Sequence, residues 1–161
     1  MRNEAEANRA INLYADTVRR ICFMHLKNDS DAEDVFQEVF LKYLLYEKPF
    51  ESDAHEKAWL IRVTVNNCKD ILKSFFRRKV YSIEDVDVEP YCMQEQDKEL
   101  LDAVLRLTPK YRDVIYLFYY EGYTAVEIAR ILNKSENTIY TWLGRARKEL
   151  KVQIGGGPIG E

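Results

Sequence analysis

The sequence predicts an all-α fold made of two small helical domains that are joined by an acidic, flexible linker. Apolar residues recur at steps of three and four along most of the chain, which is the period of an amphipathic helix. This pattern stops at residues 81–97, which are acidic and contain Pro90. We therefore predict a first domain at 1–80, the linker at 81–97, a second domain at 98–152 and a mobile tail at 153–161.

Three helices are expected in the first domain, at about residues 4–27, 31–46 and 56–76. The cluster from Asn28 to Asp31 ends the first helix and offers a cap for the next one. The first helix should bury a stripe of residues at helical spacing, namely Ile11, Tyr14, Val18, Ile21 and Cys22. His25 continues this stripe, and we interpret it as a core or boundary histidine.

The predicted second helix has two distinct faces. Its core face is apolar and consists of Ala32, Val35, Phe36, Val39, Phe40 and Tyr43. The other face mixes acidic and amide groups with leucine, at Asp34, Gln37, Glu38, Leu41 and Leu45. Because such a mixture is typical of a surface that binds another protein, we expect a protein partner here. A solvated face with two isolated leucines is the alternative.

The predicted third helix has a polar, basic face beside its buried stripe. Arg62, Asn66, Lys69 and Lys73 fall at i, i+4, i+7 and i+11, and the basic residues 77–79 extend this line. Such a face fits a phosphate backbone, and Asn66 could contact a base edge. An ordinary solvated face is the alternative. Phe50, in the loop at 47–55, either packs into the core or offers a stacking surface to an unpaired base.

Four helices are expected in the second domain, and the first two precede a helix-turn-helix. One helix at 98–107 should bury Leu100, Leu101, Val104 and Leu105. The next begins at Thr108 with Pro109 in its first turn and ends at Gly122. Its predicted core face consists of Tyr111, Val114, Ile115, Phe118 and Tyr119.

The stretch from Thr124 to Leu150 predicts two short helices with a tight turn between them. Thr124 and Glu127 have the spacing of a capping box, and Asn133 tolerates a left-handed conformation at a helix end. Ser135 can cap the second helix, whose apolar residues recur at Ile139, Trp142, Leu143, Ala146 and Leu150. A helix-turn-helix of this kind is typical of proteins that bind the major groove of DNA. An ordinary helical hairpin is the alternative.

The composition narrows the function further. The chain of 161 residues is 47% hydrophobic and 32% charged, as expected for a folded globular protein. Its net charge of −3 arises around the linker, because residues 81–100 hold seven acidic side chains and one basic side chain. No apolar run approaches the roughly 20 residues that cross a membrane, and the first residues lack the character of a signal peptide. We expect a cytoplasmic protein without membrane insertion.

Catalysis and metal binding are not expected. Cys22, Cys68 and Cys92 are widely spaced and are predicted to be buried thiols. His25 and His55 lie too far apart in the sequence to suggest a metal pair. The chain has no Gly-rich phosphate loop and no arrangement of a nucleophile with histidine. The sequence therefore predicts no enzyme activity, no metal and no cofactor.

Three motifs, in this order, resemble the bacterial RNA polymerase sigma factors of the sigma-70 family, in the extracytoplasmic-function group. DAEDVFQEVFLKY, from Asp31 to Tyr43, resembles the helix with which that family binds the polymerase clamp. AWLIRVTVNNCKDILKS, from Ala58 to Ser74, resembles its promoter-opening helix. The region from Leu107 to Leu150 resembles its distal promoter-binding domain. The resemblance covers nearly the whole chain.

The resemblance implies a protein that binds core RNA polymerase and promoter DNA. Polymerase would contact Asp34, Gln37, Glu38 and Leu41. The melted −10 element would contact Phe50, Arg62, Asn66, Lys69 and Lys73. The −35 duplex would contact Lys134, Ser135, Glu136, Asn137, Tyr140, Thr141 and Arg145. Family members often have a basic residue where this chain has Tyr140 and Trp142. The resemblance also implies an anti-sigma factor as a partner.

Other classes of protein explain the sequence less completely. A stand-alone helix-turn-helix regulator would bind a palindrome tightly without polymerase, but it leaves the faces at 34–45 and 62–73 unexplained. A structural helical adaptor accounts for neither the capped second helix of the helix-turn-helix nor the basic face. An enzyme lacks any supporting motif.

Overall fold

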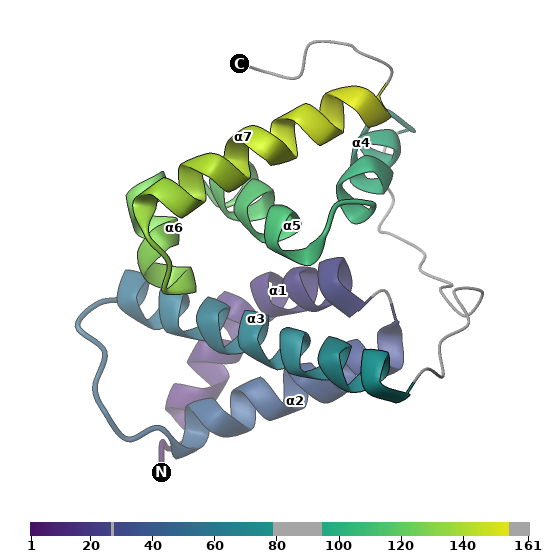
Figure 1. Cartoon of the computed structure of the whole chain (residues 1–161). Helices are drawn as coiled ribbons and strands as arrows, with labels where there is room; N and C mark the ends of the chain where they lie inside the picture. The colour runs from purple at the N-terminus through teal and green to yellow at the C-terminus, as the bar shows by residue number, and fades with distance from the viewer. Residues whose placement is uncertain (27, 79–94, 155–161) are drawn as a thin grey trace. The chain divides into compact units, whose positions relative to one another are not determined.

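The computed structural model describes residues 1–26, 28–78 and 95–154, and the side chains of 1–26, 28–72 and 99–154. Within these ranges every regular element is helical, and the chain divides into two units, Met1–Val88 and Glu89–Glu161 (Figure 1). The predicted all-α fold class with two helical domains is confirmed. The predicted linker lies outside the described residues except at 95–97, where a helix has already begun.

Unit 1 is built from three helices that pack against one another in pairs: α1 (Glu4–Leu26), α2 (Asp29–Leu45) and α3 (Asp53–Arg78) (Figure 1). Their shared core is apolar and includes Val18, Cys22, Val35, Val39, Tyr43, Leu60 and Cys68. The Asn28 side chain caps α2 by accepting a hydrogen bond from the Asp31 N–H, at 3.1 Å. The Ser52 hydroxyl accepts one from the His55 N–H, also at 3.1 Å, so α3 begins three residues earlier than predicted.

Most of the predicted core of unit 1 is buried, with one correction in α1. Ile11 is 36% exposed, whereas the neighbouring Ala10 is fully buried. Ala10 lies one helical turn before Tyr14 and so continues the buried stripe, while Ile11 is rotated away by about 100°. His25 is buried, as expected of a core histidine. Cys22 and Cys68 are buried thiols, as predicted, and Cys92 lies outside the described residues.

Unit 2 contains α4 (Glu95–Leu105), α5 (Pro109–Ile115), the π-helical turn η2 (Tyr116–Tyr120), α6 (Ala125–Leu132) and α7 (Glu136–Gln153). The long helix α7 packs against α4, α5 and α6. The largest fully buried side chains include Val114, Leu117, Ile128, Ile139 and Leu143. In α4, Val104 is buried as predicted, whereas Leu100 is 45% exposed, contrary to the prediction, and Ala103 is buried.

The turn η2 explains a second error in the predicted core of unit 2. The Glu121 N–H donates to the Tyr116 carbonyl at 3.1 Å, a bond that spans five residues where an α-helix would span four. The wide turn changes the direction in which the residues within it point. Tyr119, which an α-helix would have buried, is therefore 47% exposed, and Leu117 is buried. The Tyr119 hydroxyl accepts a hydrogen bond from Arg147 Nε at 2.6 Å, which links η2 to α7.

Replacing Gly144 by alanine is expected to stabilise unit 2. Gly144 is exposed within α7, and a Cβ added there would meet no atom within 4 Å. Because glycine costs about 1 kcal/mol relative to alanine inside a helix, the free energy of unfolding should rise by about 0.5–1 kcal/mol. Urea denaturation followed by circular dichroism measures the change. Gly122→Ala is the matched control, and it should be destabilising because Gly122 has a φ of +77°. A loss of stability in Gly144→Ala would contradict the prediction.

None of the helices in the described part of the chain combines the length and the apolar character needed to cross a bilayer.

Candidate nucleic-acid interface

The helix-turn-helix of unit 2 is held by its own local hydrogen bonds. The Thr124 hydroxyl accepts from the Glu127 N–H at 3.2 Å, and the Glu127 carboxylate accepts from the Thr124 N–H at 3.0 Å. These bonds lower the pKa of Glu127 below its ordinary value. Asn133 takes the left-handed conformation, with φ of 56°, and the Lys134 N–H donates to the Ala129 carbonyl at 2.9 Å. The predicted capping box and turn are thus confirmed.

The exposed face of α7 is the candidate recognition surface for duplex DNA. The Ser135 hydroxyl caps this helix by accepting from the Thr138 N–H at 3.1 Å. Ile139, Leu143 and Leu150 are buried against the rest of unit 2. The predicted DNA-binding residues are all exposed: Lys134, Ser135, Glu136, Asn137, Tyr140, Thr141 and Arg145. This face is open to a partner along the N-terminal part of α7.

Lys148 extends the candidate surface of α7, and Trp142 lies outside it. Lys148 is exposed and lies on the same face as Asn137 and Thr141, so it belongs to the candidate surface although we did not predict it. Its spacing of 11 residues from Asn137 was the signal. Trp142 is half-buried, and the Lys110 ammonium lies 5.5 Å from its ring centroid. Trp142 therefore turns toward α5 and away from the candidate surface.

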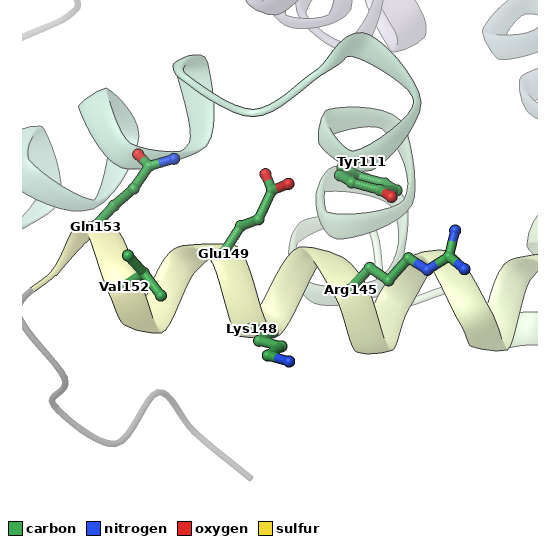
Figure 2. Close-up of a pocket in the computed structure, with 6 residues that line it drawn as sticks. All are labelled: Tyr111, Arg145, Lys148, Glu149, Val152 and Gln153. Carbon is green, nitrogen blue, oxygen red and sulfur yellow. The ribbon is translucent and has the colours of Figure 1, made fainter.

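A shallow depression of about 360 Å³ borders the candidate surface of unit 2. Its lining consists of Tyr111, Arg145, Lys148, Glu149, Val152 and Gln153. Figure 2 shows Glu149 and Gln153 pointing from α7 to the side from which α5 presents Tyr111. Arg145 thus lies both on the exposed face of α7 and at the edge of this depression.

An aromatic cluster in unit 1 brings together the end of α2, the following loop and the start of α3. The Tyr46 and Trp59 ring centroids are 4.7 Å apart, and Phe50 lies 5.5 Å from Tyr46 and 5.7 Å from Trp59. Phe50 also faces Tyr43, which is fully buried, and it is itself half-buried. The loop aromatic thus packs on the edge of the core and joins a larger group of rings.

The polar face of α3 adjoins this aromatic cluster. Arg62 and Asn66 are exposed and Lys69 is half-buried, while the side chain of Lys73 lies outside the described residues. Trp59 precedes Arg62 by three positions and Asn66 by seven, so it lies on the same side of α3. We did not predict Trp59 as a site residue, although its helical spacing from Arg62 was visible. A cationic and amide face next to aromatic rings is the arrangement that binds single-stranded nucleic acid.

The predicted protein-binding face of α2 is exposed. Asp34, Gln37, Glu38 and Leu41 are all exposed, and Leu41 and Leu45 are 54% and 60% accessible. Lys42 connects this face to α3, because its Nζ lies 3.4 Å from the Glu38 carboxylate and donates to Asn67 Oδ1 at 2.8 Å. Asn67 is buried and follows the exposed Asn66.

A buried carboxylate holds the three helices of unit 1 together. Glu56, near the start of α3, is 5% exposed. Its Oε2 accepts from the Tyr43 hydroxyl of α2 and its Oε1 from Arg9 Nη1 of α1, each at 2.8 Å. Arg9 also pairs with Asp53. No local pattern of residues predicts this network, because its members are far apart in the chain.

Unit 1 is expected to unfold in alkaline solution. Burial, reinforced by Glu56, raises the pKa of Tyr14 and of Tyr43 from 10.0 to about 12. A tyrosine with a raised folded-state pKa stabilises the fold below pH 10, and this contribution is lost as the pH rises through 12. Circular dichroism across this range should show the transition. Tyr14→Phe should move the unfolding transition to higher pH. Tyr140→Phe, at an exposed position, should leave the transition unchanged. If the two variants unfold at the same pH, ionisation of Tyr14 does not cause the loss of stability.

Comparison with protein families identifies both units. The sequence model of sigma-70 region 2 matches residues 10–79, and that of sigma-70 region 4 matches residues 97–150. The chain belongs to the sigma-70 family. It is a sigma factor of the extracytoplasmic-function group and directs promoter-specific transcription, as the sequence motifs predicted. The stand-alone regulator is not favoured, and sigma factors as a class are not enzymes.

Two relatives of this sigma factor come from Bacillus subtilis. RNA polymerase sigma factor SigV of Bacillus subtilis (strain 168) is 28% identical over 139 residues, which cover 84% of this chain and 82% of SigV. ECF RNA polymerase sigma factor SigW of the same organism is 26% identical and covers 89% of this chain and 86% of SigW. The fold resembles that of the sigma factor RpoE in its complex with the anti-sigma factor NepR from Bartonella quintana, with a TM-score of 0.79, 21% identity and coverage of 94% and 98%.

Proposed function

We propose that this sigma factor binds core RNA polymerase through α2, holds the melted −10 strand on unit 1 and recognises the −35 duplex with α7. The observation that carries the proposal is the aromatic cluster of Tyr46, Phe50 and Trp59, which lies on the same side of α3 as the exposed Arg62 and Asn66. Aromatic rings stack on unpaired bases and a basic face follows the backbone, so this surface suits a melted strand better than a duplex.

The −35 element would be bound in the major groove by the N-terminal half of α7. Asn137 and Thr141 offer hydrogen-bonding groups to base edges, and Lys134 and Arg145 offer cations to phosphates. Ser135 would contact the DNA through its backbone, since its hydroxyl already accepts the hydrogen bond that caps α7. Residues 134–151 hold five basic and two acidic side chains, so affinity for duplex DNA alone should be weak and should fall steeply with salt.

Weak binding by each surface is compatible with specific initiation because both lie in one chain. Once one promoter element is bound, the second contact becomes intramolecular and has a high effective concentration. The acidic residues 81–97, of which the structure describes only 95–97, would serve as the tether. The chain itself would catalyse nothing and would lend sequence specificity to the polymerase.

The polymerase contact would be made by Asp34, Gln37, Glu38 and Leu41. Their mixture of carboxylates and an exposed leucine favours a partner surface that is basic with an apolar centre. An anti-sigma factor would use the same face of α2, and the exposed face of α7, to exclude polymerase and DNA. The solved relative that is bound to an anti-sigma factor supports such a partner.

Transcription reconstituted with core polymerase on genomic DNA, followed by sequencing of transcript 5′ ends, tests the proposal. Start sites that share two upstream elements are expected only when the sigma factor is present. Gel shifts on a promoter found in this way should require polymerase. A tight shift on a palindrome without polymerase would instead support a stand-alone regulator and contradict the proposal.

A further inference from the structure

The residue Arg2 fastens the loop between α2 and α3 to the start of α1. Its side chain is only 14% exposed although it precedes the first helix. Its backbone N–H donates to the Leu44 carbonyl at 2.9 Å, and its Nη2 donates to the Lys48 carbonyl at 2.7 Å. Arg2 thereby contacts both the last turn of α2 and the loop that follows.

The same guanidinium lies against the rings of the aromatic cluster. Its central carbon is 4.8 Å from the Tyr43 ring centroid and 4.8 Å from that of Phe50. These two rings are parallel to within 2°, with centroids 6.2 Å apart. The Glu6 carboxylate lies 3.9 Å from Arg2 Nη1 and forms an ion pair with it. A cation held against two ring faces limits how far the Phe50 ring can turn.

The geometry of the loop depends on this contact for a physical reason. Lys48 and Phe50 lie on either side of Pro49, where the backbone has no N–H with which to form a hydrogen bond of its own. The bond from Arg2 to the Lys48 carbonyl and the contact with the Phe50 ring therefore hold the two sides of the proline. Loss of both contacts would leave the ring held by its aromatic neighbours alone.

We propose that Arg2 is a positioning residue for the −10 contact: it sets the orientation in which Phe50 meets an unpaired base. This inference rests on the proposed function of unit 1. Arg2 itself touches no DNA in this scheme. A purely structural role would lower the amount of folded protein, whereas a positioning role also changes the discrimination between bases at the −10 element.

The test uses holoenzyme reconstituted with the full chain and a promoter identified by start-site sequencing. The variants are Arg2→Ala, Arg2→Lys and Phe50→Ala. Arg19→Ala is the matched control, because the Arg19 guanidinium also lies over an aromatic ring, that of Phe36 at 4.2 Å, but Arg19 belongs to α1 and Phe36 to α2. Heparin-resistant complexes are measured on duplex DNA and on DNA that is already unpaired across the −10 element. For each variant, the amount of complex on the cognate −10 element is divided by the amount on a base-substituted −10 element. This discrimination ratio does not depend on the active fraction of protein.

Arg2→Ala and Phe50→Ala should each lower this discrimination ratio about fivefold to tenfold on both templates, by analogy with the effect of losing one base-stacking contact. Arg2→Lys, which keeps the charge but loses the planar fork, should fall between Arg2→Ala and the wild type. Arg19→Ala should stay within about twofold of the wild type, as a surface change remote from the loop.

Two outcomes separate this inference from the proposed function. An unchanged ratio in Arg2→Ala, with a reduced ratio in Phe50→Ala, would overturn the role of Arg2 and leave the −10 contact standing. An unchanged ratio in Phe50→Ala would overturn both, whatever Arg2→Ala does. Equal losses in Arg2→Ala and Arg19→Ala would also overturn the inference, since they would show a general effect of removing an arginine that lies over an aromatic ring of unit 1.

Discussion

Replacing Glu56 by alanine is expected to destabilise unit 1 by about 2–4 kcal/mol. A loss of this size is expected when a buried acceptor is removed and its hydrogen-bond partners stay behind unsatisfied. Glu56 is buried and accepts hydrogen bonds from Arg9 and Tyr43, so the change leaves a phenol and one side of a guanidinium without their acceptor. The Arg9 side chain is 45% exposed and keeps contact with water and with Asp53. We therefore place the effect below that of a fully buried ion pair.

Urea denaturation measured by tryptophan fluorescence can isolate this effect. The chain has two tryptophans, Trp59 in unit 1 and Trp142 in unit 2, so a Trp142→Phe background reports on unit 1 alone. Glu33→Ala, an exposed glutamate on α2, is the control and should change stability by less than about 0.5 kcal/mol. Glu56→Gln should lie between the two, because an amide oxygen still accepts from the Tyr43 hydroxyl. Equal stability of the Glu56 and Glu33 alanine variants would show that the network contributes nothing.

Reversing two charges on α2, Asp34→Lys with Glu38→Lys, is expected to weaken binding to core polymerase about 100-fold or more, because like charges placed across an interface cost several kcal/mol. Both side chains are exposed, so the fold should be kept. The loss of the ion pair between Glu38 and Lys42 should matter little for stability, since exposed pairs contribute less than about 1 kcal/mol. Competition with the wild-type chain for a limited amount of core polymerase measures the affinity.

The control for charge is Glu4→Lys with Asp16→Lys, which makes the same change in net charge on exposed positions of α1. It should alter affinity by only a small factor that disappears at high salt. If both double variants weaken binding to core polymerase equally, the weaker binding results from the overall charge of unit 1. In that case α2 is not the docking face. If neither does, polymerase binds elsewhere.

The parts of the fold that the sequence predicted correctly are those fixed by near neighbours. Thr124 and Glu127 are three residues apart, and Asn133 adopts its conformation within a single turn, so their roles follow from local spacing. The buried stripes of α2 and α7 follow in the same way from a regular helical period. The exposed positions of Asp34 on α2, Arg62 on α3 and Asn137 on α7 were predicted because they lie opposite or beside the buried stripe of their own helix.

The parts that the sequence did not predict depend on contacts between distant residues or on a break in regularity. Arg9 and Glu56 are 47 residues apart, and Arg2 and Lys48 are 46 apart, so no local pattern pairs them. Tyr119 was misplaced because the period of an α-helix was continued through a turn that has a wider period. The side chains whose burial was wrong, Ile11 and Leu100, stand at the edge of a stripe, where a rotation by one residue decides exposure.

The wide turn at Tyr116–Tyr120 has a consequence for the evolution of chain length in this fold. A π-helical turn contains one residue more than the α-helical turn that it replaces. In this chain Gly122 comes shortly after η2, and its positive φ redirects the chain before α6. A relative that is one residue shorter between Val114 and Gly122 can therefore keep α5 and α6 in place by closing an ordinary turn. Alignments of such chains should place a single-residue gap at this turn and not inside the helix-turn-helix.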